Sequence, residues 1–147
     1  MGKSAIGRNL LRADAVVDFS ALKEAATTST QTLFNLPAGA VVIDSFFDVV
    51  TPLNAASGIT AVTLKIGVSG STAAFCDATS AFAGTATAGS RYADKTNPST
   101  KRVFSAGADV LGTFVADSAF GDGSTSNLNA GVVRCSVLYY QLPIAGA

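Results

Sequence analysis

The chain has 147 residues, with ten lysines and arginines against ten acids, no histidine and no tryptophan. Because its net charge is zero, it lacks the basic footprint of a nucleic-acid-binding protein, and the absence of histidine excludes Ser–His–Asp and Cys–His catalysis. Hydrophobic residues make up 48% of the chain, yet no run of about 20 of them exists, so we expect no membrane span.

The first 14 residues are predicted to form a basic arm. Its basic residues and apolar anchors are Lys3, Ile6, Arg8, Leu10, Leu11 and Arg12. All three positive charges precede the first acid, Asp14. We therefore divide the chain into an arm at 1–14 and a single domain at 15–147, which is long enough for a core of its own.

Alternation of apolar and polar residues with a period of two dominates the rest of the chain and predicts strands. The predicted strands span residues 15–22, 28–36, 41–50, 59–69, 101–106, 109–117 and 131–142. Pro52 is expected to end the third strand, because proline donates no hydrogen bond to a sheet. Between residues 70 and 98 the alternation is weak, and we expect short strands and long loops there. Residues 22–26 are the only convincing helical fragment.

The same alternation predicts which side chains share a face. In the strand at 41–50, one face holds Ile43, Ser45, Phe47 and Val49, and the other holds Asp44, Phe46, Asp48 and Val50. The strand at 59–69 is expected to turn Val62, Leu64, Ile66 and Val68 inward, and the last strand places Val133, Cys135, Val137 and Tyr139 together. Many short strands with almost no helix favour an all-β fold, an antiparallel β-sandwich or jelly roll, over a parallel sheet.

Paired carboxylates are the first candidate for chemistry. Asp44 and Asp48 lie four residues apart on one strand face, and two carboxyl groups about 5–10 Å apart catalyse glycoside hydrolysis. The same pattern is typical of the solvent side of a strand, which is the interpretation we favour. We therefore predict no catalytic residue.

Oxygen-bearing side chains around a Gly-rich turn are the second candidate. They are Asp117, Asp122, Asn127 and Asn129. Calcium takes such ligands, but the spacing does not match the EF-hand loop, and Asx turns at a hairpin tip explain the same residues. We therefore predict no metal and no cofactor.

The two cysteines, Cys76 and Cys135, form no CxxC motif and have no histidine with which to share a metal. Cys135 lies within an apolar alternation, so we expect it to behave as a small buried hydrophobe. Spacing alone leaves open whether the two form a disulfide.

A second basic stretch lies near the middle of the chain. Its residues are Arg91, Lys95, Lys101 and Arg102. The segment that follows is acidic, with Asp109, Asp117 and Asp122. Such asymmetry fits complementary faces in an assembly, and a solvated surface without a partner would look the same.

Three phrases and the composition between them carry a resemblance that covers most of residues 15–143. LPAGAVVIDSFFDVVTPL and ITAVTLKIGVSGS are followed by a middle rich in Gly, Ala, Ser and Thr and by a closing VVRCSVLYYQLP. The chain resembles the head decoration or cement proteins of tailed bacteriophages, in particular those of the jelly-roll type. The resemblance implies a non-enzymatic virion protein, made in the host cytoplasm, that oligomerises as dimers or trimers. It would bind the capsid exterior between major capsid protein subunits and stabilise the shell.

On this hypothesis two sets of residues are expected to contact the capsid or another subunit. The arm contributes Ile6, Arg8, Leu10, Leu11 and Arg12, and the basic stretch contributes Arg91, Lys95, Lys101 and Arg102. The alternative is a carbohydrate- or receptor-binding module of a phage tail or fibre, with Tyr92, Tyr139 and Tyr140 as stacking platforms and calcium at Asp122. The third hypothesis is a small hydrolase that uses Asp44 and Asp48.

Overall fold

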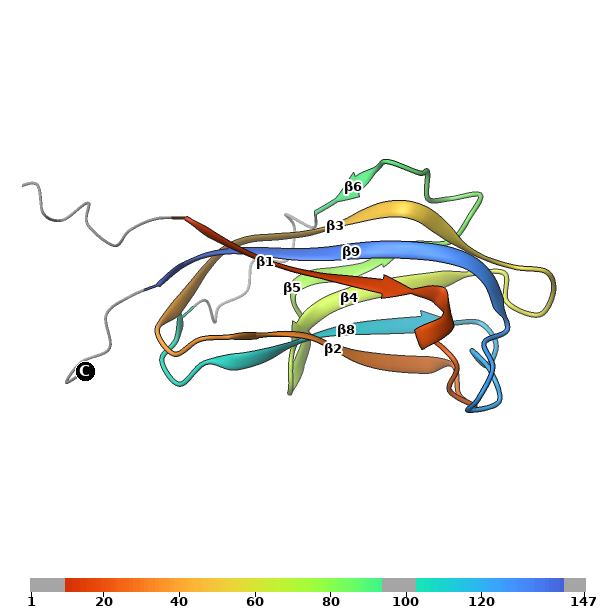
Figure 1. Ribbon diagram of the computed structural model, residues 1–147, viewed down its shortest axis with the longest axis horizontal. Coiled ribbons are helices and arrows are strands. Elements are labelled where there is room, and N and C mark those ends of the chain that lie inside the picture. The colour runs from red at the N-terminus through yellow and green to blue at the C-terminus, as the bar shows by residue number, and fades with distance from the viewer. Residues whose placement is uncertain (1–9, 94–102, 142–147) are drawn as a thin grey trace, which may run out of the picture.

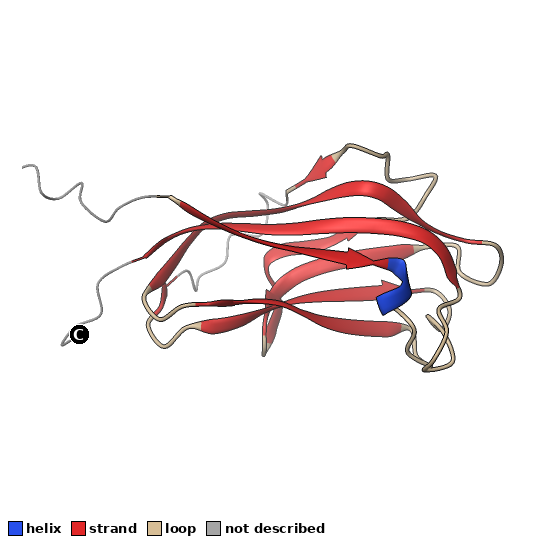
Figure 2. Ribbon diagram, in the orientation of Figure 1, coloured by secondary structure: helices blue, strands red, loops and turns tan. Residues whose placement is uncertain are grey.

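Two antiparallel sheets packed face to face make up the protein (Figures 1 and 2). The structure, a computed structural model, describes residues 10–93 and 103–141. The first sheet contains β1 (Leu11–Asp18), β9 (Leu128–Gln141), β3 (Ala40–Ala55) and β6 (Arg91–Tyr92) in that order, and β7 (Val103–Phe104) also pairs with β3. The second contains β2 (Thr28–Leu36), β8 (Ala108–Ala116), β4 (Val62–Val68) and β5 (Ser71–Ser80).

The connections between these strands are those of a jelly roll. The chain changes sheet between β1 and β2, β2 and β3, and β3 and β4, makes one hairpin from β4 to β5, and returns to the first sheet with β6 and β7. It then crosses to β8 and back to β9, which lies beside β1. The predicted all-β antiparallel sandwich of jelly-roll type is therefore confirmed. Within the described ranges, no helix has the length and hydrophobicity needed to cross a membrane.

Strand β3 is longer than predicted, because it continues through Pro52 to Ala55. The pairing of β3 with β9 is irregular on both sides of Thr51, and its register next resumes at Asn54. A proline at such an irregularity removes no regular ladder hydrogen bond, so it does not end the strand.

The helical fragment expected at 22–26 is absent from the structure. A single turn of 3₁₀ helix, η2 (Phe19–Ala21), precedes this segment and is capped by Asp18, whose carboxylate accepts a hydrogen bond from the Ser20 amide at 3.0 Å. The carbonyls that a helix would use are bound by the loop before β9. They are Lys23, Glu24 and Ala26, which accept from the amides of Gly123, Gly121 and Phe120 at 2.7, 2.9 and 3.0 Å. Tertiary hydrogen bonding thus outweighs a weak local preference.

The inner faces of the two sheets form one apolar core. The inward residues predicted for β4 and β9 are confirmed: Val62, Leu64, Ile66, Val68, Val133, Cys135 and Val137 are buried, and Tyr139 packs against them. In β3 the prediction fails at Ile43, which is 48% exposed, while Val42 is 2% exposed. A bulge between Val42 and Asp44 adds one residue to the strand and so exchanges the faces at this point.

The two cysteines lie on opposite sheets, Cys76 on β5 and Cys135 on β9, and both are buried and form no disulfide with each other. Burial raises the pKa of Cys135 to about 12, with a smaller contribution from Cys76. Because the thiolate is the reactive form, a thiol in this state is inert.

We expect both thiols of the folded protein to resist a water-soluble disulfide reagent at pH 8, and to react within minutes after unfolding in guanidinium chloride. The raised pKa of Cys135 keeps this thiol protonated, and its burial keeps the reagent away, so both slow the reaction. Absorbance of the released chromophore measures the reaction, and rapid labelling of the native protein would contradict the burial.

Phe114 of β8 is fully buried in the core. Its replacement by alanine is expected to cost about 3–5 kcal/mol of unfolding free energy, because the cavity left behind does not collapse fully. Val16→Ala, at a side chain that is 58% exposed, is the control, and we expect a change below about 0.5 kcal/mol. Urea unfolding followed by circular dichroism measures both, and similar losses would contradict the assignment of the core.

Candidate functional site

In the described part of the chain, the exposed large hydrophobic side chains lie on or next to the first sheet. Among the described residues, the large hydrophobic side chains with high exposure are Leu10, Leu11, Val16, Ile43, Val50 and Val103, with exposed fractions from 39% to 58%. Each lies on β1, β3 or β7, or directly before β1. Such residues mark interaction surfaces, so the first sheet is the candidate site.

We call the side of this sheet that points away from the core the outer face. Its residues are Arg12, Asp14 and Val16 on β1, Arg134, Ser136 and Leu138 on β9, Asp44, Phe46 and Asp48 on β3, and Arg91 on β6. The strand register aligns them in rows across the sheet. One row is Asp14, Ser136 and Phe46, and the next is Val16, Arg134, Asp48 and Arg91.

Phe46 is the centre of the outer face. Its side chain is only 4% exposed, although it does not belong to the core cluster. The guanidinium of Arg12 lies 5.2 Å from the ring centroid, and that of Arg91 lies 4.0 Å from it. The ring is therefore covered by two cations, Arg12 from β1 and Arg91 from β6, which the negative face of an aromatic ring attracts.

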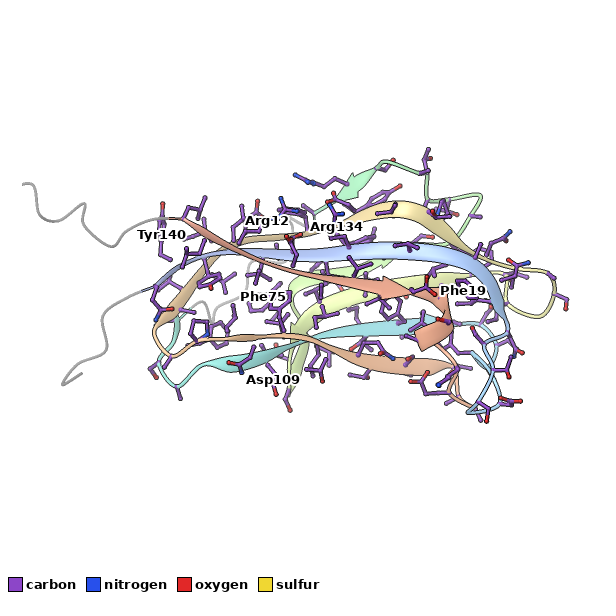
Figure 3. All side chains as sticks on the ribbon, viewed as in Figure 1. Arg12, Phe19, Phe75, Asp109, Arg134 and Tyr140 are labelled. Carbon is purple, nitrogen blue, oxygen red and sulfur yellow. The ribbon has the colours of Figure 1, made fainter. Side chains whose placement is uncertain are left out.

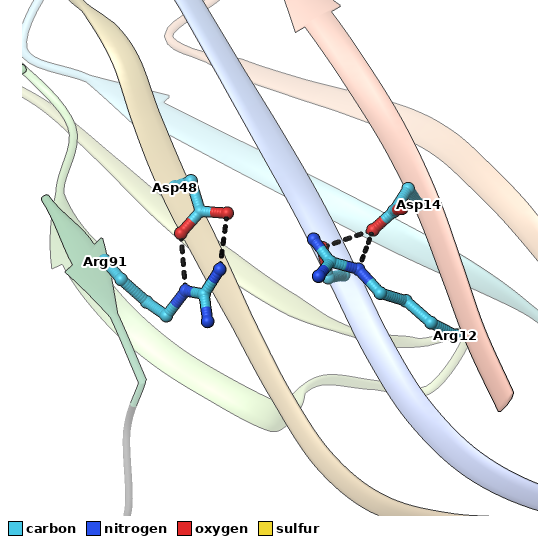
Figure 4. Close-up of polar contacts among 5 residues, drawn as sticks. Arg12, Asp14, Asp48 and Arg91 are labelled. Atoms are coloured by element: carbon cyan, nitrogen blue, oxygen red, sulfur yellow. Dashed lines mark hydrogen bonds and ion pairs between the residues drawn. The ribbon is translucent and has the colours of Figure 1, made fainter. Parts of the chain in front are cut away.

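Each of these arginines is held in turn by an aspartate (Figure 4). Arg91 makes a two-pronged ion pair with Asp48, with Nε to Oδ1 at 2.6 Å and Nη2 to Oδ2 at 3.1 Å. The hydrogen bond to Asp48 raises the pKa of Arg91 further. Arg12 Nε donates to Asp14 Oδ1 at 2.7 Å, and its Nη2 donates to Ser136 Oγ at 3.1 Å. Both cations are thus fixed before any partner arrives, which lowers the entropy lost on binding.

Partial burial acts to raise the pKa of Asp14, but the hydrogen bond from Ser136 and the interactions with Arg12 outweigh it. The Ser136 hydroxyl donates to Asp14 Oδ1 at 2.5 Å. The pKa of Asp14 therefore lies below its usual value. Through its hydrogen bond with Ser136, Asp14 links β1 to β9, and the ionised form of Asp14 is the one that these interactions favour.

The structure brings together two of the predicted contact residues, Arg12 and Arg91. They lie on the strands β1 and β6 at opposite edges of the first sheet, and both contact the ring of Phe46. Figure 3 shows Arg12 and Arg134 on this sheet. Leu10 lies directly before β1 and Leu11 is its first residue. Residues 11–14, the last four of the expected arm, are therefore part of a strand that pairs with β9. The remaining predicted contact residues lie outside the described residues. They are Ile6, Arg8, Lys95, Lys101 and Arg102.

Sequence reasoning missed the roles of Phe46 and Ser136. Alternation did place Phe46 on one face with Asp44 and Asp48, and a large aromatic side chain among acids was the available signal. Ser136 gave no signal, because its part in the site depends on β9 lying between β1 and β3.

The acids considered for chemistry have structural partners. Asp48 binds Arg91, and Asp122 Oδ1 accepts from the amides of Ser124 and Thr125 at 2.8 and 2.6 Å. These bonds, with that from Thr125 the strongest, lower the pKa of Asp122. They are the Asx turn that the sequence favoured.

Two of the three tyrosines considered as stacking platforms are also engaged. Tyr92 lies 5.3 Å from Phe47, measured between ring centroids. Tyr139 packs against the core. Both rings therefore serve packing within the sandwich.

No protein-family model and no curated protein sequence matches this chain. Its fold is similar to that of chains in three bacteriophage capsid structures. A chain of the cyanophage Pam1 capsid asymmetric unit is 25% identical, with a TM-score of 0.63 over 93% of this chain and 88% of that one. A chain of the capsid of Ralstonia phage GP4 is 18% identical, with a TM-score of 0.60 over 92% of this chain and 86% of that one. A chain of the acidic stable capsid of Helicobacter pylori bacteriophage KHP30 is 17% identical, with a TM-score of 0.52 over 92% of this chain and 90% of that one.

Asp14→Asn is expected to lower the melting temperature at pH 7 and to have progressively less effect as the pH falls below about 4. A carboxylate whose pKa is depressed in the folded state adds stability above its unfolded pKa, and this stability is lost as the pH falls through the folded pKa. Thermal melts of both proteins between pH 2 and pH 7 measure the difference. An equal loss at every pH would mean that the ionised form of Asp14 contributes nothing.

Proposed function

We propose that this chain is a structural virion protein that binds the outer surface of a phage capsid between major capsid protein subunits and stabilises the shell. The observation that carries the proposal is the likeness, over nearly the whole of both chains, to a protein of the Pam1 capsid at 25% identity. The two more distant capsid structures support the same fold.

The outer face supports a function through contact. It places the exposed Val16 on the same sheet face as two arginines that aspartates already hold, and arginine and aromatic residues are enriched where proteins bind one another. A stable interface buries about 1,600 Å² in total. On a shell with many equivalent positions, modest binding at each one stabilises the assembly by mass action.

We assign the contacts to the outer face and to the start of the chain. Leu10, Leu11, Arg12 and Arg91 come from the sequence prediction, and Val16 joins them as the most exposed large hydrophobic residue described. Ile6, Arg8, Lys95, Lys101 and Arg102 remain proposed contacts on sequence grounds. The protein is proposed to act as a dimer or trimer.

Sedimentation with shells assembled without this chain tests the proposal. The wild-type protein is expected to sediment with the shells and to raise the temperature at which they release DNA. Val16→Asp should weaken binding about tenfold or more, because a charged side chain that loses its water in the contact replaces an apolar one. Thr30→Asp is the matched control, since Thr30 is an exposed residue of β2 on the other sheet. Equal binding by both variants would exclude the outer face as the contact surface, and failure of the wild-type protein to bind would exclude the function.

The contribution of the arm requires a truncation that spares the sheet. Deletion of residues 1–14 would remove half of β1, so its effect would mix binding with folding. Deletion of residues 1–9 leaves β1 whole, and we expect it to weaken shell binding with the melting temperature unchanged. Undiminished affinity after this deletion would show that Ile6 and Arg8 make no contact.

A further inference from the structure

A hollow between the ends of β4, β7 and β8 lies apart from the outer face. It has a volume of about 290 Å³ and is lined by Val68, Ser69, Phe104, Gly107, Ala108, Asp109 and Leu111. Pockets for small ligands begin at about 300 Å³, so the hollow has room for one long side chain.

The hollow is formed by well-fixed parts of the fold. Phe104 is 3% exposed and packs edge-on against Phe75, with centroids 5.8 Å apart. Its carbonyl accepts from the Gly39 amide at 2.8 Å and from the Gly107 amide at 3.1 Å. These bonds hold the turn between β7 and β8 against the turn between β2 and β3.

Asp109 is the charged residue among the described residues that line the hollow. Asn35 Nδ2 donates to its Oδ1 at 2.9 Å, which orients the carboxylate, and an ionised carboxylate accepts several further hydrogen bonds. Val68, Phe104 and Leu111 supply apolar surface beside this acceptor. An apolar wall with a carboxylate matches a side chain with a hydrocarbon stem and a cationic head, which is lysine or arginine.

We infer that this hollow receives one lysine or arginine side chain of the capsid protein to which the chain binds. The inference rests on the proposed function, since that function supplies the partner. It assigns a second contact, on the edge of the sandwich near the β7–β8 turn, besides the outer face.

The hollow itself is tested with N-acetyl-arginine methylamide as the probe and its citrulline analogue as the uncharged control of the same shape. We expect saturable shifts of the amide resonances of Phe104, Gly107 and Leu111 with the arginine probe only, and their loss in Asp109→Asn. Equal shifts with both probes, or no shifts near the hollow, would overturn the inference.

Shell binding tests the contact in the assembly. Asp109→Asn keeps the shape of the side chain and is expected to weaken binding about tenfold, whereas Asp77→Asn, an equal charge change on β5, should bind as the wild type does. If the wild-type protein binds shells and Asp109→Asn binds equally well, the inference fails and the proposed function stands. If the wild-type protein does not bind, the proposed function fails, and the arginine titration still reports on the hollow. A loss of self-association in Asp109→Asn with shell binding intact would assign the occupant to a second copy and overturn the inference.

Discussion

The position of β9 between β1 and β3 is the constraint on which the rest of the structure depends. This strand pairs with β3 from Leu128 to Gln141 and with β1 from Val132 to Tyr139. Its inward residues form the centre of the core, and its outward residues set the rows in which β1 and β3 present their side chains. Because side chains alternate along a strand, a slip of one residue would exchange the core and the outer face. The fold and the candidate site are therefore fixed by the same pairing.

The outer face shows how a protein can present charge without a large cost on binding. Arg12 and Arg91 cover Phe46 and are each bound to an aspartate. Exposed ion pairs of this kind add little to folding stability. Their value lies in holding long side chains in one arrangement, which leaves less conformational freedom to lose when a surface is covered. The other sheet has no comparable concentration of exposed apolar residues in the part of the chain that the structure describes.

Local sequence pattern predicted most of the long strands but not all of their bounds, since β1 spans Leu11–Asp18 and not residues 15–22. β2 agrees with its prediction at both ends, and β9 shows the expected inward face. β5 was not recognised, because its register against β4 shifts twice and Ala74, Phe75 and Cys76 are buried in succession. These irregularities remove the alternation that identifies a strand. Ile43 was misplaced for the same reason, by a single bulge in β3. The site was predictable only in part. Alternation groups Phe46 with its neighbouring acids, but its meeting with two distant arginines depends on strand order, which no local pattern encodes.

The adjacency of β1 and β9 has a practical consequence for engineering. Leu11 lies opposite Tyr139, so the described chain enters and leaves the sandwich at the same pole, about 5 Å apart across one strand spacing (Figure 1). A peptide or fluorescent cargo genetically fused before β1 or after β9 would be anchored at this pole in either case. The opposite pole, with the loops after β3 and β8, is the place for an inserted cargo that must stand clear of both ends.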